Sequence, residues 1–113
     1  MKKSILILLV GLFSLVSFSQ EKKDKNKKVE FAVNGNCEMC KKRIEKAAFS
    51  VKGVKSATWH TDHKDLHLIL DENKCSVADV QKAIVKVGHD AGDLKASDED
   101  YEKLHGCCQY ERL

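Results

Sequence analysis

The sequence predicts an α+β fold in which two helices cover one face of an antiparallel four-stranded sheet, the ferredoxin-like βαββαβ open-faced sandwich. Apolar residues alternate along three short stretches and recur at helical spacing along two others, in the order strand, helix, strand, strand, helix. A weaker stretch at residues 89–96 adds a fourth strand, with which the order becomes that of a split βαβ sandwich. The expected order of strands across the sheet is 4-1-3-2.

The N-terminal residues 1–19 have the pattern of a secretory signal peptide. Two lysines precede an apolar run over residues 4–18, and small residues near its end favour cleavage at Ser19/Gln20. The run is shorter than the about 20 residues that a membrane-spanning helix needs, so a membrane anchor is the weaker alternative. We therefore expect an exported, periplasmic protein without a membrane span once the signal is removed.

The charge balance of the chain does not distinguish between folds, but it indicates which kinds of partner to expect. Without residues 1–19 the chain keeps 18 basic residues against 17 acidic ones, a net charge of +1, which gives no reason to expect nucleic acid as a partner. Residues 20–28, which precede the first predicted strand, are rich in lysine and contain no apolar side chain, so we expect a charged linker. Residues 29–96 then form the predicted domain, and residues 97–113 an acidic tail with a Cys-Cys pair.

The first strand and the first helix flank a short loop. Val29, Phe31 and Val33 alternate with less apolar residues, as in a half-buried strand, which Gly35-Asn36 interrupts. Apolar residues at helical spacing then predict a helix of about four turns that ends near Gly53. Its apolar positions are Ile44, Ala47, Ala48 and Val51.

A hairpin and a second helix complete the pattern. Residues 54–59 and 66–70 alternate as two strands on either side of a polar turn. Ser76 is the expected N-cap of the second helix, and Asp79 occupies the position of its capping-box partner. The helical spacing continues until Gly88, which stops the helix.

Cys37 and Cys40 in the loop are the main candidate site residues. They lie three positions apart where a strand ends and a helix begins, so both thiols can turn toward one point. The backbone N–H groups and the dipole of a helix N-terminus favour the thiolate over the thiol. A thiolate binds a soft metal or attacks a disulfide. The loop therefore offers either a metal site or a dithiol redox site.

A metal site fits the loop better than a redox enzyme. Two thiolates suit Cu(I), or Hg(II) as a toxic mimic, because soft ions accept few sulfur ligands. Zn(II) is the other candidate, although a structural zinc site needs four ligands and the loop supplies two. Thioredoxin-like enzymes use a cis-proline beside the dithiol, and this chain contains no proline. We expect a non-catalytic, solvent-facing metal site, with dithiol–disulfide exchange as the alternative.

Three further cysteines lie outside the loop. Cys75 precedes the second helix and is expected to fill a small apolar slot. Cys107 and Cys108 begin at the far end of the domain from the loop, unless the tail folds back. They could join Cys37 and Cys40 in one thiolate site, form a second site, pair between molecules, or serve as structural thiols. Adjacent cysteines rarely bond to each other comfortably.

Two other clusters each have a functional and a structural interpretation. His60, His63 and His67 in the hairpin could hold a borderline metal ion, although exposed polar positions explain them equally simply. The basic run at residues 41–43 could stabilise thiolates or dock an acidic partner, and a solvated helix face also explains it.

Four short motifs occur in a characteristic order along the chain. They are Gly35–Cys40, Lys42–Ala47, Gly53–Ala57 and Val87–Ala91. Through these motifs, residues 29–96 resemble the heavy-metal-associated (HMA) domains of small copper chaperones, of copper-transporting ATPases and of the periplasmic mercury-binding protein.

The resemblance implies a metal site at Cys37 and Cys40 and a partner protein with exposed cysteines that delivers or accepts the ion. It implies a Cu(I) carrier or scavenger, or, as an alternative, a mercury-binding resistance protein. The loop is one residue shorter than the family's usual Gly-Met-x-Cys-x-x-Cys and lacks the methionine that packs beneath it. A histidine near this loop approaches the metal in some members, so His89 becomes an accessory-ligand candidate beside Cys107 and Cys108.

Overall fold

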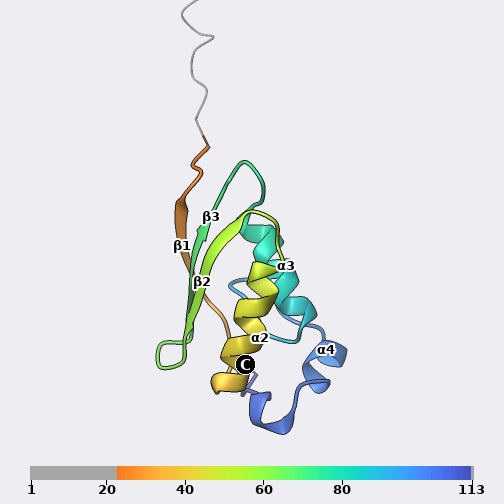
Figure 1. Cartoon of the computed structure of the whole chain (residues 1–113). Coiled ribbons are helices and arrows are strands. Elements are labelled where there is room, and N and C mark those ends of the chain that lie inside the picture. Colours follow the sequence, from red (N-terminus) through yellow and green to blue (C-terminus); the bar gives the residue numbers. More distant parts are fainter. Residues whose placement is uncertain (1–22, 113) are drawn as a thin grey trace, which may run out of the picture.

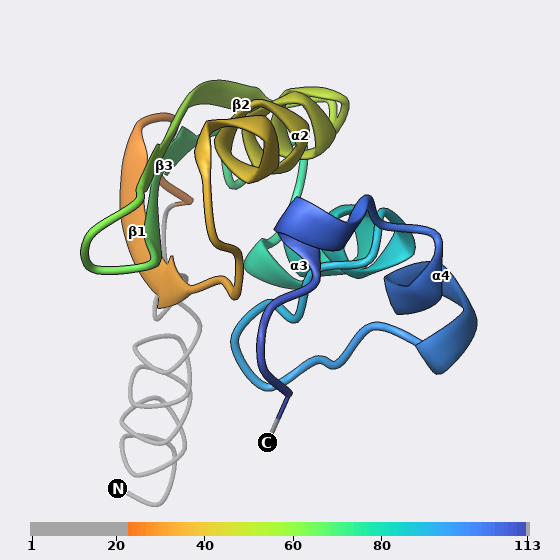
Figure 2. The ribbon, with the colours of Figure 1, turned by 90° about the horizontal axis from the view of Figure 1, so that it is seen from below.

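The computed structural model describes residues 23–112, which form a sheet layer and a helix layer (Figure 1). Strands β1 (Lys27–Ala32), β2 (Val54–His60) and β3 (Asp65–Leu70) form an antiparallel sheet in the order β1-β3-β2. Helices α2 (Glu38–Phe49) and α3 (Val77–Lys86) lie on the same side of this sheet (Figure 2). The predicted fold class is confirmed. The predicted signal peptide lies outside the described residues.

The fourth strand differs from the prediction in extent. The described residues contain no regular strand between residues 89 and 96, but the Asn34 N–H donates to the Asp90 carbonyl and the Gly92 N–H to the Ala32 carbonyl. These bonds hold the segment at the free edge of β1, where the order 4-1-3-2 requires the fourth strand. The segment stays short because the chain turns back at Gly92, whose φ is +58°, and the next residues pair with Ala91.

The start of α3 follows the prediction closely. The Asp79 N–H donates to Ser76 Oγ at 3.2 Å, and the Ser76 N–H donates to Asp79 Oδ2 at 2.9 Å, which is the predicted capping box. Cys75 is buried next to this cap, as expected for a small apolar residue. β1 begins at Lys27, two residues before the predicted start.

A single core lies between the sheet and the helices. Its fully buried side chains include Val33, Ile44, Trp59, Leu66, Leu70, Val80 and Ile84. Leu104, Cys108 and Tyr110 from the C-terminal tail belong to the same cluster. Among the described residues no helix has the length and apolar character needed to cross a bilayer.

The C-terminal tail folds back to the cysteine loop, which decides where Cys107 and Cys108 lie. It contains helix α4 (Asp98–Glu102) and a 3₁₀ turn, η2 (Gly106–Cys108), and it returns along the ends of α2 and α3 (Figures 1 and 2). Buried Tyr110 anchors it, since its hydroxyl donates to the Gly88 carbonyl at 2.8 Å and accepts from the Asp90 N–H at 3.0 Å.

Candidate metal centre

Cys37 and Cys40 occupy the first turn of α2. Cys37 is the N-cap residue with an extended backbone, and Cys40 is the third residue of the helix. The N-cap conformation turns the Cys37 side chain toward the free N–H groups of the first turn, which is where a thiolate finds donors. Both thiols therefore lie on one side of the helix start, as their spacing predicts.

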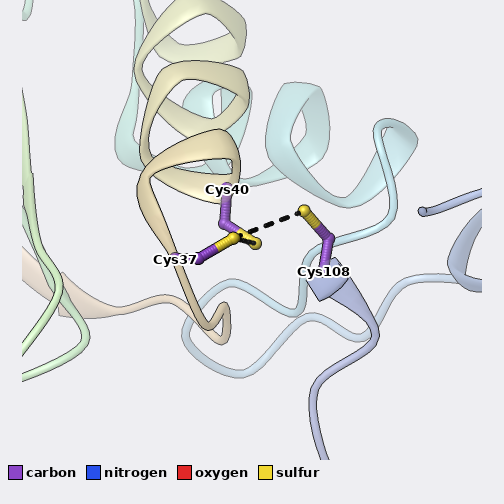
Figure 3. Close-up of side chains that lie close together, drawn as sticks. All are labelled: Cys37, Cys40 and Cys108. Carbon is purple, nitrogen blue, oxygen red and sulfur yellow. Dashed lines mark hydrogen bonds between the residues drawn. The ribbon is translucent and has the colours of Figure 1, made fainter. Parts of the chain in front are cut away.

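The structure brings a third sulfur to this pair. The Sγ atoms of Cys37 and Cys40 are 3.8 Å apart, and Cys108 Sγ lies 4.0 Å from Cys37 Sγ. All three sulfurs lie within 4.8 Å of one another and face a common space (Figure 3). Such a donor set, made of sulfur alone, suits a soft metal ion.

The two loop thiols differ strongly in acidity. The backbone N–H groups at the helix start, that of Cys40 above all, outweigh burial and lower the pKa of Cys37 to about 7. Burial and the neighbouring Cys108 thiol raise the pKa of Cys40 to about 11. Near neutral pH, Cys37 is therefore the thiol that ionises first, while Cys40 keeps its proton until something replaces it.

The expectation of a solvent-facing site is wrong for Cys40. Cys40 and Cys108 have no exposed surface, and Cys37 is only half-buried. The cause is the tail, because Cys108 and Tyr110 pack into the same core as Cys40. The sulfurs are nevertheless close enough to share an ion, and Cys37 remains the point of access from solvent.

Trp59 lies beneath the short loop. A Cβ added to Gly35 would lie 3.2 Å from two carbons of the Trp59 ring and 3.1 Å from Cys40 Cβ. The indole N–H donates to the Val33 carbonyl at 3.0 Å, which fixes the ring against the end of β1. The indole thus fills space under a loop that lacks the family's methionine, and a side chain at position 35 would require the Trp59 ring or Cys40 to shift.

His89 lies next to the loop but outside the sulfur cluster. Its Nδ1 is 2.7 Å from the Asn34 carbonyl, which can only accept, so Nδ1 carries the proton. Its Nε2 is 3.5 Å from Arg43 Nη1, which can only donate. Burial, the main cause, lowers the pKa of His89 and keeps the ring neutral. Because both nitrogens have partners, the structure does not support His89 as an accessory ligand.

Cys107 lies at the rim of the site. Its side chain is exposed, with Sγ 3.9 Å from Cys108 Sγ and 4.0 Å from Met39 Sδ. Its carbonyl accepts from Asn36 Nδ2 at 3.4 Å and from the Cys37 thiol at 3.8 Å. The backbone of Cys107 thus connects the tail to the loop, while its sulfur stays outside the cluster of three.

The hairpin histidines do not gather around a common point. His67 lies between two carboxylates, with Nδ1 3.1 Å from Glu30 Oε1 and Nε2 2.9 Å from Asp65 Oδ2. Its two ring nitrogens point in opposite directions, so they cannot hold one ion. His60 contacts the His67 ring edge-on, and His63 is exposed at the turn. His60 and His67 are partly buried, and only His63 is exposed. One His67 nitrogen lies within 4.8 Å of oxygens of Glu30 and Asp65, a group that does not include the other two histidines.

Sequence reasoning missed the groups that hold the tail against the loop. Asp90 is the central one: its Oδ1 accepts from Arg112 Nη2 at 3.1 Å and from the Ala96 N–H at 2.8 Å, and its Oδ2 from Asn34 Nδ2 at 3.4 Å. Tyr110 completes the connection through Gly88. An isolated aromatic residue just after the Cys-Cys pair was the available signal that the tail packs on the domain.

Three solved structures of other proteins are similar to this chain. The CopZ metallochaperone is 27% identical, with a TM-score of 0.56, and the match covers 57% of this chain and 98% of that one. Oxidized MerP from Ralstonia metallidurans CH34 is 25% identical, with a TM-score of 0.57, and the match covers 59% of this chain and 94% of that one. The N-terminal domain of a potential copper-translocating P-type ATPase from Bacillus subtilis, in the Cu(I)-loaded state, is 29% identical, with a TM-score of 0.57, and the match covers 65% of this chain and 92% of that one.

The other comparisons found no relative: no protein-family model and no curated protein matches the sequence. The structural matches cover almost the full length of the similar proteins but leave part of this chain unmatched. In its fold the chain is therefore similar to the heavy-metal-associated domains, and the family resemblance predicted from its sequence is confirmed.

Proposed function

We propose that this chain is a metal-binding protein that holds Cu(I) reversibly, with Cys37 and Cys40 as primary ligands. The observation that carries the proposal is the 3.8 Å separation of the two sulfurs at a helix N-terminus, where one of them ionises near neutral pH. A metal ion replaces the proton of Cys40, whose thiol is otherwise hard to ionise. The role that we propose is binding and transfer of an ion rather than catalysis, since the similar structures include a metallochaperone.

Cu(I) is the ion that the donor set and the similar structures favour together. Thiolate sulfur selects soft ions, and Cu(I) accepts few ligands. One similar structure is the Cu(I)-loaded N-terminal domain of a potential copper-translocating ATPase, and another is a metallochaperone. Hg(II) would bind the same sulfurs, and the similarity to MerP makes a mercury-binding resistance protein the nearest variant of this proposal.

Transfer to a partner would begin at Cys37. It is the half-buried thiol of the pair, whereas Cys40 is buried, so an incoming thiolate reaches the ion from the Cys37 side. The proposed partner is a metal-transfer protein with exposed cysteines, such as a domain of a copper-transporting ATPase. The predicted signal peptide adds the proposal that this exchange occurs outside the cytoplasm.

One observation favours a second function, dithiol–disulfide exchange. The accessible thiol of Cys37 has a lowered pKa, and the buried thiol of Cys40 beside it has a raised pKa. Such a pair is suited to exchange, because the first thiol can attack a substrate disulfide and the second can then release the mixed disulfide. The chain lacks proline, so the cis-proline of thioredoxin-like enzymes is absent. Turnover of a model disulfide by the reduced protein would favour this function over metal transfer.

A competition titration tests the main proposal. The reduced protein is titrated anaerobically with Cu(I) against a chromophoric chelator, beside the Cys37→Ser/Cys40→Ser variant. Cys75→Ser is the matched control, because Cys75 is buried elsewhere in the core. We expect one tightly held Cu(I) in the wild type and the control, and loss of tight binding in the double variant. Equal affinity in all three proteins would refute the proposal.

A further inference from the structure

The C-terminal tail places a buried cysteine, Cys108, at the metal site. A site made of the two loop cysteines alone does not explain why a third is there. Cys108 has no exposed surface, yet its sulfur lies 4.0 Å from Cys37 Sγ and within 4.8 Å of Cys40 Sγ. Figure 3 shows its side chain directed from the tail into the space that the two loop thiols face. Cys107, its exposed neighbour, does not take part in this cluster.

The distances fit an ion with three sulfur neighbours. A point equidistant from sulfurs separated by 3.8 Å, 4.0 Å and at most 4.8 Å lies about 2.2 to 2.5 Å from each, close to the about 2.3 Å of a zinc–thiolate bond. Two such bonds on opposite sides of an ion would hold their sulfurs about 4.6 Å apart. Cys37 and Cys40 are closer than that, so the two sulfurs cannot lie on opposite sides of an ion. The side of the ion toward Cys108 therefore remains open for a third ligand.

The position of Cys108 is enforced by contacts on both sides of it. Ahead of it, the Cys107 carbonyl accepts from Asn36 in the loop. After it, Tyr110 is buried and bonded to the backbone at Gly88 and Asp90. Arg112 then pairs with Asp90, which also contacts Asn34 at the start of the loop. The tail is thus fixed to the loop directly at Asn36 and, through Asp90, to Asn34 at the start of the loop.

We propose that the C-terminal tail supplies Cys108 as a third ligand, so that the centre is a trigonal three-thiolate site for a soft monovalent or divalent ion. The inference rests on the proposed function. On binding, the protons that remain on the three thiols pass to solvent and three metal–sulfur bonds form, with no change of oxidation state. The third sulfur makes the ion harder to remove, since a partner must displace Cys108 as well as compete for Cys37.

The test counts sulfur neighbours. X-ray absorption is recorded on the Cu(I)-loaded wild type, on Cys108→Ser and on Cys107→Ser, which is the matched control because the adjacent sulfur is exposed. We expect three sulfur neighbours in the wild type and in Cys107→Ser, and two in Cys108→Ser. Cu(I) affinity should fall at least about tenfold in Cys108→Ser only, since loss of even an indirect supporting group typically costs about 10–100-fold.

Two outcomes overturn different statements. Two sulfur neighbours in the wild type, with tight binding that depends on Cys37 and Cys40, would refute the third ligand and leave the proposed function intact. Absence of tight binding in the wild type would refute the proposed function itself. Because the wild-type count needs no variant, the inference remains testable even if the Cys108→Ser protein fails to fold, which circular dichroism would reveal.

Discussion

Cys37 Sγ and Cys108 Sγ lie 4.0 Å apart, although 71 positions separate the two residues in the chain. Cys37 is the N-cap residue of helix α2, while Cys108 is the last residue of the 3₁₀ turn in the C-terminal tail. Their proximity joins the metal loop and the tail into one unit. The chemical properties of the loop therefore depend on residues that the two-cysteine motif does not include.

The acidity of the loop thiols predicts their reactivity. In the reduced, metal-free protein, iodoacetamide should modify Cys37 with a rate that rises as the pH passes about 7 and its thiolate forms. Cys40 should stay largely unmodified until the pH nears about 11, because burial keeps it protonated. Mass spectrometry of peptides after timed quenching measures both rates. Equal modification of the two residues at neutral pH would contradict the assigned asymmetry.

Removing the hydroxyl of Tyr110 should weaken the attachment of the tail. Tyr110→Phe leaves a buried carbonyl at Gly88 and a buried N–H at Asp90 without their partner, which typically costs about 1–3 kcal/mol. Urea unfolding should show this loss, and Cu(I) affinity should fall because Cys108 is less well held. Glu111→Gln changes an exposed neighbour and is the control. Unchanged stability and affinity in Tyr110→Phe would mean that this anchor is dispensable.

The loop should not tolerate a side chain at Gly35. In Gly35→Ala the new methyl group would lie 3.1 Å from Cys40 Cβ and 3.2 Å from the Trp59 ring, tighter than ordinary contact. Overpacking of this kind typically costs about 1–3 kcal/mol, and any shift of the loop should also lower metal affinity. Gly106→Ala is the control, because nothing lies within 4 Å of its added Cβ. Thermal unfolding and the chelator competition measure both effects; a result equal to the control would show that the loop adapts without cost.

Oxidation should abolish metal binding reversibly. A disulfide between Cys37 and another thiol of the cluster removes the thiolates that an ion requires. Treatment of the metal-free protein with oxidised glutathione should therefore prevent Cu(I) uptake, and reduction should restore it. Thiol titration before and after each step counts the cysteines involved. Full Cu(I) uptake by protein whose loop cysteines are shown to be oxidised would contradict the sulfur-ligand account.

The sequence predicts the fold and the loop because both depend on local patterns. Alternation in β1 and helical spacing after Cys40 specify the elements, and the Cys-x-x-Cys spacing specifies which thiols converge. The fourth strand is overestimated, because a turn at Gly92 interrupts a stretch with few β-forming residues. Local patterns cannot reveal such a turn when the apolar residues around it are sparse.

The environment of the loop depends on long-range contacts and could not be predicted in the same way. The sequence leaves several roles open for Cys108, because only the packing of Tyr110 decides where the tail ends. His89 lies near the loop as expected, but its two ring nitrogens already have partners in Asn34 and Arg43. The packing of Trp59 beneath the loop likewise depends on a contact between residues that are distant in the sequence.

The central statement, that this chain carries a soft metal on cysteine sulfur, is tested most directly on protein taken from its native cells. Protein isolated anaerobically is analysed for its elements, and X-ray absorption is recorded on the same sample. We predict copper in the Cu(I) state with sulfur as its only neighbours. Protein isolated without any thiophilic metal, or a metal surrounded by nitrogen and oxygen, would contradict the account.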